Sequence, residues 1–240
     1  MYNLNDIFSM VRYQLDYILQ CLPYIILHFM ALFFLRNILL KVFALNGGGG
    51  SSLLPANNYF QYRFFLLGAM LVFSWLVTVF VFIYQNFGFY FCGDFIFIAG
   101  VLLGWRAAWP VLLAHLIFMP AWLHLIGYGG VLISYAMLDS IIYFAVGLLS
   151  GAQFDAVEEE YGYSDILLVC ANKLVAALVS TACWALLIND SRFSGINILI
   201  FRLLGWPLAS LPMIFLVLFL MKQDAKQLDL HPARKAENPA

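Results

Sequence analysis

Charged residues are scarce in this sequence of 240 residues: Asp, Glu, Lys and Arg together make up 10%. A soluble globular domain carries roughly 25% charged residues. With 64% hydrophobic residues and a mean hydropathy of +0.91, the chain cannot cover a surface that faces water. We therefore predict an integral membrane protein. A formal net charge of −1 gives no reason to expect a nucleic-acid partner.

The sequence also lacks the short motifs that announce enzymatic chemistry. It contains no P-loop, no glycine-rich dinucleotide turn, no nucleophile elbow and no His-Glu-x-x-His pair. His115 and His124 are nine positions apart, which puts them on different helix faces, so we expect packing residues rather than metal ligands. Four cysteines without metal-ligand spacing are expected to be free thiols: Cys21, Cys92, Cys170 and Cys183. No enzymatic activity, cofactor or metal is predicted.

Long apolar runs are what the sequence does contain, and a membrane-spanning helix needs about 20 such residues. The hydropathy pattern predicts helices at residues 16–35, 64–84, 89–104, 107–126, 131–150, 166–188 and 206–221. The predicted fold class is an all-α, polytopic transmembrane helix bundle of six to seven spans. Six spans would follow if one of the two shortest segments is re-entrant.

The predicted organisation is one transmembrane domain over residues 1–221 followed by a polar tail. The domain contains a flexible Gly/Ser loop at 46–58, and the tail at 222–240 is expected to be cytoplasmic and disordered. The acidic loop at 151–165 is interpreted as a solvated face, with divalent-cation binding as the alternative. Residues 195–204 are expected to form an interfacial helix on the outer side that carries Arg202.

Lys and Arg residues beside the predicted spans fall mostly on one side of the membrane. With seven spans, that side carries Arg36, Lys41, Arg63, Arg106 and Lys222, whereas Arg12 and Arg192 fall on the other. Cytoplasmic loops carry an excess of Lys and Arg. We therefore predict a cytoplasmic carboxyl terminus and an amino terminus outside.

A few polar residues lie within the apolar runs, where an ionisable group costs a few kcal/mol unless it has a partner or a water-filled cavity. At a rise of 1.5 Å per residue, Asp94 and Asp139 lie roughly 15 Å from the cytoplasmic end, and Lys173, next to Asn172, roughly 10 Å from it. We expect one lysine to face two aspartates. Three interpretations are open: a salt bridge that fixes helix order, a polar pocket that binds a ligand or a proton, or independent positions that face lipid. Arg202 is a further candidate.

A second polar group is expected near the outer surface. It consists of Gln85, Asn86, Tyr90, Tyr128 and Arg202. Such residues form either an interfacial belt or the rim of a pocket open to the periplasm.

Residues 98–151 carry a more specific pattern. An apolar run leads into Gly-Trp-Arg, then Ala-Ala-Trp-Pro, a helix, a glycine turn and a second helix ending in small residues. This stretch resembles the membrane-associated sensor (MASE) domains that precede bacterial histidine kinases and diguanylate cyclases. The chain is also similar to the receptor module of LytS-type kinases. The resemblance implies a bacterial inner-membrane sensor in which Arg106, Trp109 and Pro110 shape the central hairpin, with Pro110 in the first turn of its helix.

Three functions are compatible with these features. The first is a ligand-sensing or signal-input module, with a possible small-molecule ligand, that acts through a protein partner or a homo-oligomer because the sequence contains no output domain. The second is a substrate-binding subunit of a transporter, and the third is a structural subunit of a membrane complex.

Overall fold

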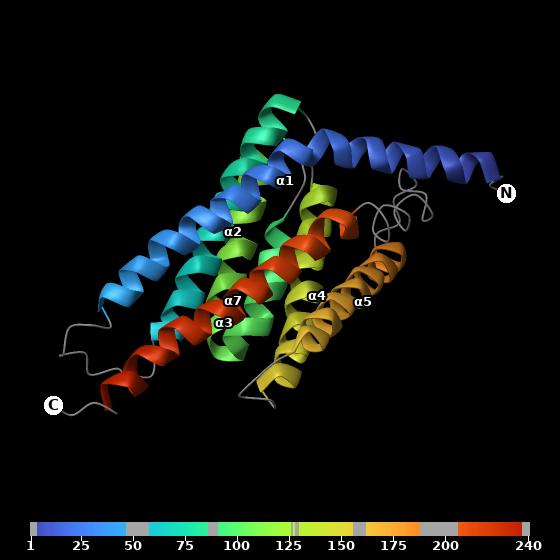
Figure 1. Ribbon diagram of the computed structural model, residues 1–240. Coiled ribbons are helices and arrows are strands. Elements are labelled where there is room, and N and C mark those ends of the chain that lie inside the picture. Colours follow the sequence, from blue (N-terminus) through green and yellow to red (C-terminus); the bar gives the residue numbers. More distant parts are fainter. Residues whose placement is uncertain are drawn as a thin grey trace.

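The computed structural model describes residues 4–46, 58–85, 91–125, 127, 130–155, 162–187 and 206–236. These residues form helices and no strand, which confirms the all-α prediction (Figure 1). The helices are α1 (Leu4–Asn46), α2 (Asn58–Gln85), α3 (Cys92–Leu125), α4 (Gly130–Asp155), α5 (Tyr163–Leu187) and α7 (Trp206–Ala236).

Five of these helices are long and apolar enough to cross a membrane, which supports a multi-pass membrane protein. The candidate spans are Val11–Phe43, Phe60–Phe80, Cys92–Leu125, Tyr163–Leu186 and Pro207–Asp224, and α4 contains the shorter apolar segment Ala136–Ala152. Large apolar side chains are exposed along these helices, including Phe34 at 66% and Ile117 at 67%. Hydrocarbon, rather than water, is the solvent in which such a surface is stable.

Helix α3 is a hairpin of two limbs, because Gly104 has φ 68° and ψ 173°. Gly147 and Gly151 of α4 lie against the backbone of Phe97 and Val101, so residues 92–103 run parallel to α4. Residues 105–125 run the opposite way, since Trp109 contacts Phe144 and His115 contacts Ser140. The predicted helices at 89–104 and 107–126 correspond to these two limbs.

The first limb of α3 begins inside the bundle. Its residues 92–103 are almost all buried and rise by roughly 18 Å, less than the ~30 Å of a bilayer core. Phe91, which precedes it, is 1% exposed, and its ring centroid lies 4.7 Å from that of His28, near the middle of the first candidate span. By itself this limb is therefore shorter than a membrane-spanning helix.

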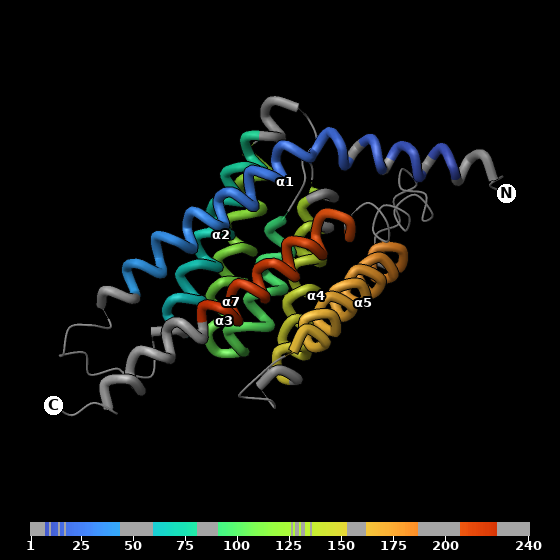
Figure 2. Tube along the Cα trace, viewed as in Figure 1, coloured from blue at the N-terminus to red at the C-terminus, as the bar shows by residue number. Residues whose placement is uncertain are grey.

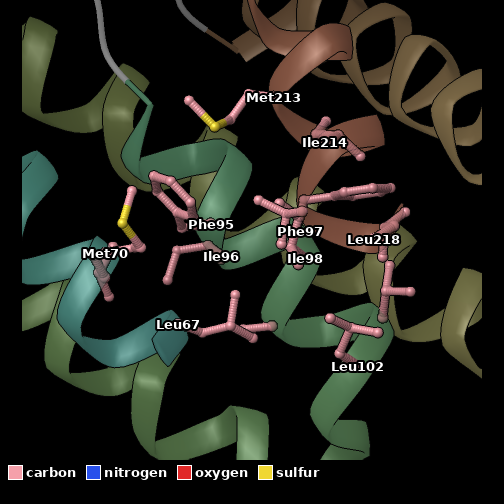
Figure 3. Close-up of a cluster of buried hydrophobic side chains, with 14 of the residues drawn as sticks. Leu67, Met70, Phe95, Ile96, Phe97, Ile98, Leu102, Met213, Ile214 and Leu218 are labelled. Atoms are coloured by element: carbon pink, nitrogen blue, oxygen red, sulfur yellow. The ribbon is translucent and has the colours of Figure 1, made fainter. Parts of the chain in front are cut away.

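The first limb of α3 also forms the centre of the hydrophobic core. Its side chains lie between those of α2 and α7 (Figure 3). The labelled members of this cluster are Leu67, Met70, Phe95, Ile96, Phe97, Ile98, Leu102, Met213, Ile214 and Leu218.

Two helices extend further than the sequence predicted. Helix α1 has 43 residues, about 65 Å in length, and its amino-terminal part leaves the bundle, with Pro23 inside the helix (Figure 2). Helix α7 ends at Ala236, beyond the last span that the sequence predicted, and the cytoplasmic placement and disorder of the tail stay predictions. The Gly/Ser loop at 47–57, the acidic segment at 156–161 and the interfacial helix expected at 195–204 lie outside the described residues.

Candidate functional site

A buried ion pair joins three helices in the middle of the bundle. Lys173 Nζ of α5 lies 2.7 Å from Asp94 Oδ1 of α3, and the two side chains are 3% and 0% exposed. Ser210 of α7 donates a hydrogen bond of 2.7 Å to the same oxygen. The predicted pairing of Lys173 with Asp94 is therefore present, and it includes a serine that the sequence did not indicate.

Asp94 owes its position to the start of the first α3 limb. The backbone N–H groups of Asp94 and Phe95 donate to the Phe91 carbonyl at 2.9 and 3.1 Å, so the carboxylate lies in the first helical turn. A negative charge in that turn interacts favourably with the helix dipole. The second carboxylate oxygen, Oδ2, is buried and has no hydrogen-bond partner among the described residues.

Two aromatic rings lie near the Lys173 ammonium. Nζ lies 3.2 Å from the ring centroid of Tyr143 and 5.5 Å from that of Phe97. A cation over an aromatic face is attracted by the ring quadrupole, more strongly where water is excluded. We call the set of Asp94, Phe97 and Tyr143 near the ammonium, with Ser210 hydrogen-bonded to Asp94, the cation cage.

Asp139 lies at a different level from the cation cage. It accepts a hydrogen bond from Ser180, which follows Lys173 by seven positions on α5, or about 10 Å. The reason is the antiparallel register of α4 and α5, which also pairs Asn172 Nδ2 with Ser150 Oγ at 3.0 Å. Asn172 is thus in a separate contact from Lys173, and the expected approach of Asp139 to Lys173 stays a prediction.

The residues expected to shape the hairpin surround its turn. The Trp105 and Trp109 rings stack at 5.2 Å, and Trp109 packs on Phe144 at 5.9 Å, while Arg106 is exposed. Pro110 lies inside the second limb rather than in its first turn, because the helix resumes directly after Gly104. Arg202 lies outside the described residues.

Comparison of the chain with known protein families, curated proteins and solved structures finds no match. The resemblance to bacterial sensor domains stays a prediction.

A second ionic cluster, which the sequence reading missed, joins α1, α2 and α7. Arg36 Nε donates to Asp224 Oδ1 and Oδ2 at 3.0 and 2.9 Å, and the Tyr62 hydroxyl donates to Asp224 Oδ2 at 2.5 Å. Asp224 is 0% exposed. The sequence does indicate that Asp224 faces the bundle, because Val217, Met221 and Asp224 follow the i, i+4, i+7 spacing of one helix face.

Two histidines, His28 and His115, make hydrogen bonds between helices, and both bind neighbouring residues of α2. His28 donates from Nδ1 to the Tyr24 carbonyl at 2.7 Å, and its Nε2 lies 3.0 Å from Ser74 Oγ. His115 accepts from Trp75 Nε1 at 2.9 Å through Nδ1, and its Nε2 lies 2.9 Å from Ser140 Oγ.

These contacts fix the role of His115. Because Ser140 Oγ donates to a backbone carbonyl, His115 Nε2 must be the donor to Ser140, so this geometry requires the neutral ring. His115 is thus a hydrogen-bonded packing residue, as expected. No group of three metal-ligating side chains occurs among the described residues.

An open groove of about 470 Å³ lies between α1 and α2, away from the cation cage. Its lining is wholly apolar: Leu35, Phe64, Phe65, Gly68, Ala69, Val72, Phe73 and Leu76. Such a lining offers nothing to orient a charged or polar ligand. The chemistry available in the described part of the chain is therefore concentrated at the two ionic clusters.

Proposed function

We propose that this chain is a signal-input module of a bacterial inner membrane, without a catalytic domain of its own, that acts through a partner protein. The observation that carries the proposal is that one helix, α7, takes part in both ionic clusters. Ser210 near its start binds Asp94, and Asp224 binds Arg36 and Tyr62.

The distance between these contacts gives α7 its proposed role. Ser210 and Asp224 are 14 positions apart, which corresponds to about 21 Å along the helix. A change that breaks the Ser210–Asp94 contact would favour another position of α7, and the helix would carry the shift to residues 225–236. A ligand can drive such a shift only by binding one arrangement better than the other.

The proposed orientation places the carboxyl-terminal end of α7 in the cytoplasm. Arg36, Lys41, Arg63 and Lys222 all lie toward the end of the bundle that contains Asp224, as does Arg106 beside the hairpin turn. This distribution supports that end as the cytoplasmic one. A partner would then meet residues 225–236 on the cytoplasmic side.

Spin labels on full-length protein in lipid nanodiscs test the proposal. Labels at Lys226→Cys of α7 and Asn37→Cys of α1, in a Cys183→Ser background, report the distance between the two helices. Asp94→Asn should shift or broaden the distance distribution, because it leaves Lys173 without its carboxylate partner. Asp16→Asn, the same change at an exposed position of α1, is the matched control and should leave the distribution as in the unsubstituted protein. An identical distribution in Asp94→Asn would contradict the coupling.

A transport subunit is the second candidate, supported by the first α3 limb. Half-helices that begin inside the membrane and carry polar groups at their ends are typical of substrate and ion sites in transporters. Accumulation of a substrate in proteoliposomes that depends on Asp94 would favour this function over signal input.

A further inference from the structure

We propose that the cation cage is a binding site for a small organic ammonium ion, and that Asp139 receives Lys173 when this ligand binds. In the structure Lys173 itself occupies the cage as a tethered cation. The inference deepens the proposed function, because it names the chemical class of the input, and its signalling part rests on that function.

The groups around Lys173 Nζ match any primary ammonium ion. Asp94 supplies a carboxylate oxygen at 2.7 Å, and Tyr143 and Phe97 supply ring faces at 3.2 and 5.5 Å. Aromatic faces combined with a negative charge are the recognition chemistry of ammonium ligands. None of these groups distinguishes a lysine side chain from a free alkylammonium ion.

An unused acceptor is the second observation that points to a ligand. Asp94 Oδ2 is buried and accepts no hydrogen bond from a described residue, while Oδ1 accepts from Ser210 and contacts Lys173. An ammonium group carries three N–H donors. A free ammonium ion is not constrained by a side-chain stem, so it can reach both carboxylate oxygens at once.

Asp139 offers Lys173 an alternative counter-ion. It precedes Tyr143 by four positions on α4, so the two side chains share a helix face and are separated by a rise of about 6 Å. The lysine ammonium already lies on the Tyr143 ring, at the end of a flexible four-carbon stem. Rotation of the stem would carry it toward Asp139.

Charge balance favours the exchange. With both carboxylates ionised, Asp94 and Lys173 in candidate spans and Asp139 in the apolar segment Ala136–Ala152 carry a net charge of −1. One further monovalent cation makes this group neutral. A neutral group costs less in hydrocarbon than a charged one, so uptake of a monovalent cation is favourable here.

Removal of the tethered cation tests the site directly. In full-length Lys173→Ala, propylammonium chloride should raise the Tm saturably, and equal concentrations of 1-propanol or potassium chloride should not. The double variant Lys173→Ala/Asp94→Asn should bind propylammonium at least tenfold more weakly. A response equal to that of 1-propanol, or an undiminished response in the double variant, would overturn the proposal.

Asp139 is tested by comparing two backgrounds with radiolabelled methylammonium. Asp139→Asn should weaken binding at least tenfold in the unsubstituted chain, where Lys173 must move. The same change in Lys173→Ala should alter binding less than twofold, because no lysine has to be accommodated. Equal losses in the two backgrounds would reject the exchange with Asp139.

Folding of the variants is itself informative. If Lys173→Ala is recovered only when purified with propylammonium, the amine is acting as the missing cation. Recovery of Lys173→Ala/Asp94→Asn but not of Lys173→Ala in the presence of amine would overturn the proposal. If neither variant is recovered, methylammonium binding is compared between the unsubstituted chain and Asp94→Asn. Equal binding by these two proteins would reject the site.

The spin-label measurement separates this inference from the proposed function. If the amine binds but the distance between the labels on α1 and α7 does not change, the binding site is supported and its role in signalling is rejected. If Asp94→Asn changes this distance but the protein binds no amine, the proposed signal-input function is supported and the amine site is rejected.

Discussion

Ser210 donates to the same Asp94 oxygen that contacts the Lys173 ammonium, although 116 positions separate Ser210 from Asp94. The shared oxygen makes α3, α5 and α7 mutually dependent. Any change at Asp94 therefore affects α5 and α7 as well as α3. The stability of the bundle should reflect this dependence.

Asp94→Asn should destabilise the protein strongly. The substitution removes the carboxylate that Lys173 contacts in the structure, and breaking a buried ion pair costs about 3–5 kcal/mol in proteins. Lys173→Met added to Asp94→Asn should restore much of the loss, because no charge is then left alone. Unfolding titrations in mixed micelles measure both effects, and a double variant no more stable than Asp94→Asn would contradict the pairing.

Gly147→Ala should separate α4 from the first limb of α3. A Cβ at Gly147 would lie 2.3 Å from the Phe97 carbonyl oxygen, which is backbone and cannot move aside. Overpacking of this kind costs about 1–3 kcal/mol. Gly68→Ala is the matched control, because nothing lies within 4 Å of its added Cβ. Melting curves of the two proteins should differ, with Gly68→Ala close to the parent.

Gly104→Ala should weaken the hairpin of α3. Its φ of 68° with ψ of 173° is a backbone conformation reserved almost entirely for glycine, and a side chain there costs about 1–3 kcal/mol. No neighbouring atom would clash with the added methyl group, so any loss of stability reports the backbone alone. Gly130→Ala, also without neighbours within 4 Å, serves as the comparison, and equal Tm values for the two would argue against the hairpin turn.

Truncation after Met221 should destabilise the bundle, although it removes only residues beyond the predicted last span. The truncated chain loses Asp224 and leaves Arg36 and Tyr62 without the partner that ties α1 and α2 to α7. Truncation after Gln227 keeps Asp224 and is the control. The shorter chain should show the lower Tm, and Tyr62→Phe should cost about 0.6–1.7 kcal/mol, the range for a membrane hydrogen bond.

Local properties of the sequence were enough to predict several features. The all-α, multi-pass character follows from composition, because the preference for hydrocarbon accumulates residue by residue along each apolar run. The two limbs of α3 were predicted as the separate apolar segments 89–104 and 107–126, because a break in an apolar run is a local property. Asp94 and Lys173 could be singled out because a charge within an apolar run needs a partner.

Only the tertiary structure decided which groups meet. The register of α4 against α5 put Asp139 beside Ser180, and the close packing of glycine on Phe97 helps to set where α3 lies against α4. Arg36 and Asp224, 188 positions apart, were placed beside a span and in the polar tail, yet they form an ionic cluster in which Asp224 is buried. The physical reason is that a partner for a charge is chosen by packing between distant segments, whereas hydropathy and helical spacing describe one segment at a time.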